Sequence, residues 1–252
     1  MKAGFIALAA ALAVLAAPAA GQEREQDLSN PDSDFVDTTP KKAWQAEIES
    51  TERGFLIGNP DAEARLTEFI SYTCSHCADF AREAGPPMDL VLVAPGRLGV
   101  EVRSFIRNWL DVTVSLLAQC GDPAGFKDRH RLFLYTQDEW LARAANAPRS
   151  QQEGWARGTA EARLNAARAL DLDDTLVERG MNRAEINTCL ADDAAAERLM
   201  ANSKADAEEL GIRGTPSFAL DGELLDDVHA WPQLRGVLAS RYAPEGGPAA
   251  SE

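Results

Sequence analysis

Residues 65–80 have the sequence RLTEFISYTCSHCADF, and this stretch decides the fold. Its first half is apolar and rich in aromatic and β-branched residues, which predicts a buried strand. A helix is predicted over 77–84, and the Gly-Pro-Pro sequence at 85–87 is expected to end it. Cys74 and Cys77 therefore form a CxxC motif between a strand and a helix, with Cys74 at the helix N-terminus.

The elements that follow this motif have the order of one α/β domain with an insertion. A second strand is predicted at 98–106. Residues 112–202 contain no convincing strand but several amphipathic stretches of helical period, which predict an inserted helical domain. Residues 213–225 predict a strand, an Asp-Gly turn and another strand. Residues 231–242 predict a closing helix with Pro232 in its first turn.

We therefore predict an α/β protein with a thioredoxin-like fold and an inserted helical domain. The thioredoxin-like domain comprises residues 51–111 and 203–242, and the helical domain comprises 112–202. Residues 22–50 are polar and acidic and are predicted to form a flexible N-terminal segment, and 243–252 are predicted to form a flexible tail.

The N-terminus has the pattern of a secretory signal peptide. Lys2 precedes an apolar run that reaches about Ala17, and small residues follow it. We predict a signal peptide over residues 1–21; the alternative is an uncleaved membrane anchor, for which the run is short. Cleavage would release the protein into the periplasm, where disulfides form and persist.

Composition excludes one class of function. The chain has 252 residues, 45% of them hydrophobic, which is enough to bury a core without the help of disulfides. Its formal net charge is −15, and it has no cluster of Lys and Arg that could neutralise phosphates. We therefore expect no nucleic-acid binding, and we expect the acidic surface to keep the protein a soluble monomer.

The CxxC motif predicts redox chemistry, because thiol–disulfide exchange requires a thiolate. The helix N-terminus, the imidazole of His76 and a proton shared with Cys77 would each lower the pKa of Cys74. Cys74 is then the attacking sulfur, and Cys77, one helical turn further on, resolves the mixed disulfide. A stable thiolate makes the disulfide form a strong oxidant.

Three other interpretations of the motif stay open. Structural zinc needs a second pair of ligands, which the three histidines do not supply. Copper could bind through Cys74, His76 and Cys77, and a static disulfide would close a small, strained loop. His130 is expected on a helix face and His229 in a loop, and neither is given a catalytic role. We expect no metal and no cofactor, because the dithiol itself carries the electrons.

Two stretches, EFISYTCSHCADF and, much later, GIRGTPSF, resemble the DsbA-like family of secreted thiol–disulfide oxidoreductases. The resemblance implies that Cys74 is the nucleophile, that Cys77 is the resolving cysteine and that His76 stabilises the thiolate. It also implies that Glu68 accepts the proton of a buried Cys77. Without the resemblance, Glu68 would be a carboxylate on the polar face of a strand.

The resemblance also gives a role to Thr215-Pro216, since the family has a cis-proline that faces the CxxC. Ser75, Thr215 and Pro216 are expected to contact substrate, with the Thr215 backbone pairing with an extended peptide. Two departures from the family matter. Ser75-His76 replaces the commoner Pro-His pair, which leaves the reduction potential open, and threonine before the cis-proline also occurs in isomerase-type relatives.

Cys120 and Cys189 both lie in the predicted helical domain. We predict a structural disulfide between them that clamps two helices and contributes about 4 kcal/mol in the chain-entropy model. The alternatives are two separate buried thiols or a second redox pair.

The predicted function is that of a periplasmic thiol–disulfide oxidoreductase, which transfers a disulfide to reduced, exported proteins through a Cys74/Cys77 cycle. Its expected partners are unfolded or reduced exported proteins and a membrane redox partner that reoxidises the dithiol. One alternative is a disulfide reductase or isomerase kept reduced by a membrane donor. Another is a periplasmic copper-binding protein with a thioredoxin fold.

Overall fold

The structure is a computed structural model that describes residues 42–243. The predicted signal peptide (1–21), the linker up to residue 41 and the tail from residue 244 lie outside the described residues. In the described part, no helix combines the length and the apolar character needed to cross a membrane.

The described chain contains six strands and ten α-helices. The strands are β1 (Ile48–Ser50), β2 (Phe55–Ile57), β3 (Ala64–Ile70), β4 (Leu98–Ser104), β5 (Ser217–Leu220) and β6 (Glu223–Leu224). The α-helices are α1 (Ser75–Met88), α2 (Trp109–Gln119), α3 (Phe126–Tyr135), α4 (Gln137–Asn146), α5 (Arg149–Trp155), α6 (Ala160–Ala169), α7 (Leu172–Glu178), α8 (Arg183–Ala191), α9 (Asp193–Leu210) and α10 (Trp231–Arg241). The short helices are η1 (Trp44–Ala46) and η3 (Pro123–Gly125), both 3₁₀ turns, and η2 (Asp89–Val93), a π-helical turn.

The strands form one mixed sheet in the order β1-β2-β4-β3-β5-β6. Only β3 and β4 run parallel, and the other neighbours are antiparallel. β3 is buried on both faces from Leu66 to Ile70, as a central strand must be. Because Phe69 of β3 pairs with Ser217 of β5, the residues just before β5 lie beside the segment that leaves β3.

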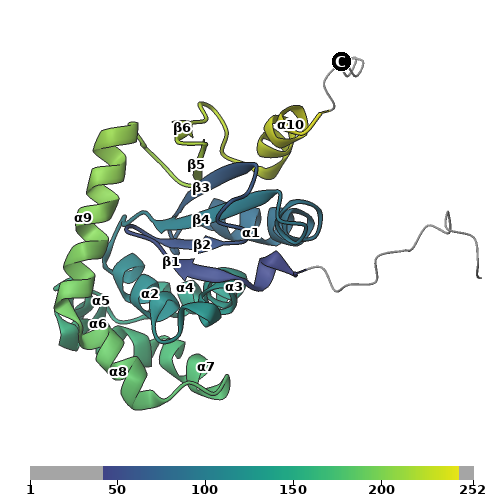
Figure 1. Ribbon diagram of the computed structural model, residues 1–252. Coiled ribbons are helices and arrows are strands. Elements are labelled where there is room, and N and C mark those ends of the chain that lie inside the picture. Colours follow the sequence, from purple (N-terminus) through teal and green to yellow (C-terminus); the bar gives the residue numbers. More distant parts are fainter. Residues whose placement is uncertain (1–41, 244–252) are drawn as a thin grey trace, which may run out of the picture. The chain divides into compact units, whose positions relative to one another are not determined.

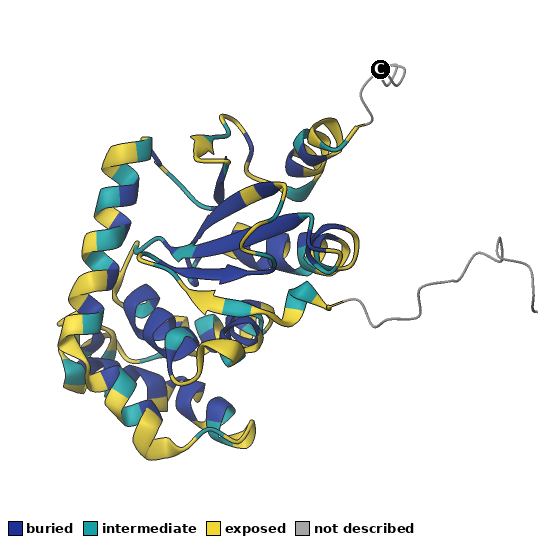
Figure 2. Cartoon of the chain, in the orientation of Figure 1, coloured by how far each residue is buried: buried dark blue, intermediate teal, exposed yellow. Residues whose placement is uncertain are grey.

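Helices cover the sheet and extend beyond it. Figure 1 shows α2 to α8 gathered below the sheet, with α9 running back along one side towards β5. Figure 2 shows that the central strands and the inner faces of α1 and α2 are buried, whereas α9 is exposed along much of its length. The described residues belong to one compact unit, so the helical block packs on the sheet and does not form a separate body.

The helical block begins earlier and ends later than the sequence predicted, and it occupies 109–210 in place of 112–202. It begins at Trp109 because the side chain of Asn108 caps α2, accepting hydrogen bonds from the N–H groups of Leu110 and Asp111. It ends at Gly211, whose left-handed φ of 73° terminates α9.

Two further local predictions were wrong. The sheet starts at Ile48, inside the segment 22–50 that was predicted to be flexible, because β1 pairs with β2. The Gly-Pro-Pro at 85–87 does not end α1, which continues to Met88 and into η2. The lost proline N–H groups are tolerated there because continuing the helix buries Leu92 and Val93.

Candidate active site

Cys74 is the N-cap residue of α1, in the position that the sequence predicted. The chain leaves β3, turns through Ser71–Thr73 and enters α1, with Cys74 in an extended conformation (φ −97°, ψ 117°). Its carbonyl oxygen accepts hydrogen bonds from the backbone N–H groups of Cys77 (3.1 Å) and Ala78 (3.3 Å). Cys74 is 6% exposed and Cys77 is fully buried, and both are free thiols.

The two thiols have opposite acidities. The pKa of Cys74 is lowered from 9.0 to about 4, chiefly by a hydrogen bond from the Cys77 side chain, with smaller contributions from Thr215, the Cys77 backbone and the charge of Arg107. Burial opposes this effect but does not overcome it. The pKa of Cys77 is raised, first by its burial and then by the neighbouring Cys74. Cys74 is therefore a thiolate at neutral pH, while Cys77 keeps its proton.

The loop that contains the proline faces the first cysteine. The Thr215–Pro216 peptide bond is cis, and Sγ of Cys74 lies 3.2 Å from the Thr215 carbonyl oxygen, to which the sulfur donates a hydrogen bond only while it is protonated. The Thr215 hydroxyl is buried and has no partner among the described residues. It is therefore available to the Cys74 thiolate, in keeping with its contribution to the lowered pKa.

His229 was predicted to be a loop residue without a role, and the structure brings it to this site. Its Nδ1 lies 2.9 Å from the Pro216 carbonyl oxygen, so it helps to hold the loop that faces Cys74. Ser75 and His76, in contrast, are exposed in the first turn of α1. His76 is not among the groups with the largest effect on the pKa of Cys74, and its role in stabilising the thiolate stays a prediction.

Glu68 does not lie on a polar strand face, since it is only 5% exposed and lines a cavity together with residues of α1. Burial raises its pKa to about 7, and the charge of Arg131 opposes this rise. The Glu68 side chain lines a small cavity of about 40 Å³, and Lys127, His130 and Arg131 line the same cavity. A carboxyl group whose pKa lies near neutrality can take up or release a proton during turnover.

His130 lies on a face of α3, as expected, and this face is buried against the same region. Its Nδ1 lies 3.0 Å from the hydroxyl of Tyr72, a residue of the turn that leads to Cys74. Burial and the charge of Arg131 lower the pKa of His130 to about 3, so its ring is neutral at physiological pH.

Two residues of the helical block hold the active-site turn, and the sequence analysis missed both. Asp111, fully buried, accepts hydrogen bonds from the Ser71 hydroxyl (2.8 Å) and the Thr73 N–H (2.9 Å). Gln137, also fully buried, donates from Nε2 to the carbonyl oxygens of Tyr72 (2.7 Å) and Cys74 (2.9 Å). A lone Asp in the apolar run LDVTVSLL was the available signal for Asp111; Gln137 had none.

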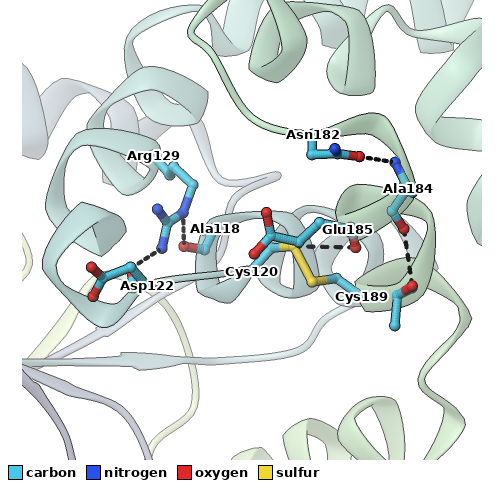
Figure 3. Close-up of a disulfide and its surroundings, with 9 residues drawn as sticks. Ala118, Cys120, Asp122, Arg129, Asn182, Ala184, Glu185 and Cys189 are labelled. Carbon is cyan, nitrogen blue, oxygen red and sulfur yellow. Dashed lines mark hydrogen bonds between the residues drawn. A yellow bond between two sulfur atoms is a disulfide. The ribbon is translucent and has the colours of Figure 1, made fainter.

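The second pair of cysteines is far from this chemistry in the fold. Cys120, at the end of α2, and Cys189, in α8, form a disulfide with a Cα–Cα distance of 5.7 Å. Figure 3 shows it beside Glu185, with Arg129 bound to the carbonyl oxygens of Ala118 and Asp122. The disulfide therefore joins two helices of the block, in the arrangement expected of a structural clamp.

No three His, Cys, Asp or Glu side chains of residues 42–243 converge in a way that could hold a metal ion. The geometry around Cys74 suits thiol–disulfide exchange directly: an ionised sulfur, a protonated partner one turn along the helix, and a carbonyl-bearing loop opposite.

This fold and this site define a class of protein. A family model described as thioredoxin matches residues 50–240, and the chain belongs to the thioredoxin family. A protein-disulfide isomerase from Novosphingobium aromaticivorans has a solved structure that is 37% identical, with a TM-score of 0.71, over 74% of this chain and 95% of that chain. DsbA1 of Wolbachia pipientis shares the fold, with a TM-score of 0.54 and 19% identity over 71% of this chain and 79% of that one.

A curated relative from Rickettsia conorii, provisionally named a protein-disulfide oxidoreductase, is 26% identical over 206 residues and matches 81% of this chain. The match spans 66% of that relative's own length, and a match to a second such protein, from Rickettsia bellii, spans 62%. The chain is therefore a member of the thioredoxin family that is similar in sequence to these protein-disulfide oxidoreductases and shares its fold with DsbA1.

Proposed function

We propose that this chain is a thiol–disulfide oxidoreductase that works as a periplasmic dithiol oxidase and transfers the Cys74–Cys77 disulfide to reduced, exported proteins. The observation that carries the proposal is the contrast between the two thiols: the pKa of Cys74 is lowered to about 4 and that of Cys77 is raised. A thiolate that is stable at neutral pH favours the reduced form, and the disulfide form is then a strong oxidant.

The reaction begins when a substrate thiolate attacks Sγ of Cys74. The Cys74–Cys77 bond breaks, Cys77 leaves as a thiolate, and Glu68 supplies the proton that the buried sulfur needs. A second substrate thiolate then attacks the substrate sulfur of the mixed disulfide, and Cys74 leaves as its stabilised thiolate. The substrate gains one disulfide, and two electrons pass to the enzyme cysteines.

The loop at Thr215-Pro216 would hold the substrate during these steps. The Thr215 carbonyl oxygen faces Cys74, and an extended peptide can pair with the Thr215 backbone as an added strand. Ser75 and His76 are exposed beside the sulfur and would contact the same peptide. No cofactor takes part in this scheme, since the dithiol carries both electrons.

Reoxidation requires an electron acceptor, for which we propose a membrane redox partner. In this reverse step Glu68 takes back the proton of Cys77. The sequence pattern of residues 1–21 supports export, and the net charge of −15 supports a soluble monomer.

A second candidate function follows from one comparison: the relative with 37% identity is described as a protein-disulfide isomerase. An isomerase or reductase must be kept reduced, and its potential lies lower than that of an oxidase. The direction of electron flow therefore distinguishes the two functions.

The deciding experiment is the reduction potential of Cys74–Cys77, measured against glutathione buffers on the protein without residues 1–21, with Cys74→Ala as the control. A value well above that of the glutathione couple supports the oxidase. A value near about −270 mV, as in thioredoxin, would support the reductase or isomerase. If no reversible dithiol equilibrium appears, both enzyme functions are wrong and copper binding becomes the leading hypothesis.

A further inference from the structure

A groove lies between the loop 105–108, which joins β4 to α2, the first turn of α2 and the C-terminal half of α9. It has a volume of about 410 Å³. Most of its lining is apolar, from Phe105, Ile106, Trp109, Val112 and Met200. Trp109 is 36% exposed there, although large aromatic side chains usually lie in the core. An apolar hollow of this kind on an acidic, soluble chain is a candidate binding surface.

The walls of the groove are held in place without a ligand. The backbone N–H of Ile106 donates to the Ser203 hydroxyl at 2.8 Å, which ties the loop to α9. The ring of Trp109 packs on Gly158, where a Cβ atom would come within 2.1 Å of the ring. Gly158 also has a positive φ of 67°, so both the backbone conformation and the close contact with Trp109 require glycine at this position. The groove is therefore preformed, which lowers the entropic cost of binding.

The charge of the groove is opposite to that of the chain. The net charge of the protein is −15, yet the groove lining includes Arg107 and Lys204 and no Asp or Glu. Arg107 forms no ion pair among the described residues, and Lys204 has only an exposed contact with Glu208 at 3.8 Å. Such an exposed pair contributes little. Both cations are therefore free to attract an acidic partner.

Hydrogen bonds connect one wall of the groove to the redox site. The Asn108 side chain donates to the Thr73 hydroxyl at 2.7 Å, and Thr73 is the residue before Cys74. The backbone N–H of Arg107 binds Asp111, which also holds Thr73. One wall of the groove is therefore bonded to the segment that presents Cys74, which places the groove where residues flanking a bound substrate cysteine can reach it.

We propose that this groove binds the part of a substrate protein that flanks its reacting cysteine, and that it selects an apolar side chain next to a carboxylate. The inference rests on the proposed function and adds its substrate class. A second apolar hollow, lined by Trp231, Arg235 and Leu238, lies by the C-terminal end of α1, away from Cys74, and serves as the control surface.

The test uses the oxidised protein and short peptides with one cysteine. The peptides carry Phe-Glu, Phe-Lys or Ala-Lys at two to six residues from the cysteine, on either side, and the second-order rate of mixed-disulfide formation is measured. In the best register, Phe-Glu should react at least about tenfold faster than Ala-Lys, from apolar burial and one ion pair. The preference for Glu over Lys should shrink as salt is added.

Lys204→Glu should remove or invert the preference for Glu, whereas the matched charge reversal Arg235→Glu should leave it unchanged. Ala207→Trp, which fills the groove, should slow all Phe peptides towards the rate of Ala-Lys. Equal rates for all peptides in every register would overturn the inference, as would an equal effect of Arg235→Glu. A concentration-dependent dimer that Lys204→Glu dissociates would also overturn it, since the groove would then join copies of the chain.

Dithiothreitol separates this inference from the function on which it rests. It needs no groove, so it should reduce the wild type, Lys204→Glu and Ala207→Trp at the same rate, and the three reduction potentials should agree. Failure of dithiothreitol to reduce Cys74–Cys77 reversibly would reject the proposed function, and the groove proposal with it. Normal reduction without peptide selectivity would reject the groove proposal alone.

Discussion

Nε2 of Gln137 lies 2.9 Å from the carbonyl oxygen of Cys74, and this hydrogen bond joins the first residue of α4 to the N-cap of the active-site helix. The same nitrogen reaches the Tyr72 carbonyl oxygen at 2.7 Å. Asp111 fixes the two residues on either side of Tyr72, Ser71 and Thr73, from α2. The helical block therefore sets the conformation of the turn that presents the reactive sulfur.

Replacing Gln137 with Leu should lower the free energy of unfolding by about 1–3 kcal/mol, because the buried Tyr72 carbonyl loses its donor. Urea unfolding of the oxidised protein measures this change. The matched control is Gln151→Leu, since the Gln151 side chain makes no hydrogen bond among the described residues and should be nearly neutral. A positioning role further requires that the reduction potential of Gln137→Leu shift; equal potentials would leave Gln137 a stabilising residue only.

The thiolate of Cys74 should titrate near pH 4. Absorbance at 240 nm of the reduced protein, minus that of Cys74→Ser, should rise through a midpoint near this value. Because the folded-state pKa is lowered from 9.0, the resulting stabilisation of the reduced protein is complete above about pH 9. It is lost progressively as the pH falls to about 4. A midpoint above pH 8 would contradict the role of Cys74 as a ready nucleophile.

The parts of the fold that the sequence predicted depend on local patterns. The strands β3 and β4 are seven residues long, and the β5–β6 hairpin has an Asp-Gly turn in its sequence. Asp221 and Gly222 adopt the positive φ angles (51° and 90°) that a tight hairpin turn needs. β1 and β2 were missed because three-residue strands are too short to show alternation. β2 depends on pairing with β4, which no local window contains, and β1 depends in turn on pairing with β2.

The candidate site divides in the same way. Cys74 and Cys77 were found from their spacing, and Thr215-Pro216 from its resemblance to a family motif. The supports of these residues were not found, because they act across 38 positions in the case of Thr73 and Asp111 and 63 in that of Cys74 and Gln137. Hydrogen bonds between residues so far apart in the sequence depend on how α2 and α4 pack against the active-site turn. The apolar pattern of the sequence shows that these helices exist but not which segments they contact.

Glu68→Gln should stabilise the oxidised protein at alkaline pH but not at acidic pH. Burial raises the pKa of Glu68 from 4.5 to about 7, so its ionisation destabilises the native state as the pH rises through this interval, by about 3 kcal/mol in full. The variant should therefore unfold at higher urea concentration than the wild type at pH 8 and at the same concentration at pH 4. The exposed Glu178→Gln is the matched control. If Glu68→Gln raised the stability equally at pH 8 and at pH 4, the stabilisation would not come from removing a buried ionised carboxylate, and the prediction would be wrong.

Removing the Cys120–Cys189 disulfide should weaken the fold and spare the chemistry. The bridge joins residues 69 positions apart, for which the chain-entropy model gives about 4 kcal/mol, so Cys120→Ala/Cys189→Ala should lose about 2–4 kcal/mol in urea unfolding. The reduction potential of Cys74–Cys77 should not change, because Cys120 lies at the opposite end of α2 from Asp111, which holds the active-site turn. Cys74→Ser, which keeps the bridge, is the control for stability. A double variant of normal stability that can no longer be reoxidised would instead identify Cys120–Cys189 as a second redox pair, through which electrons leave the protein.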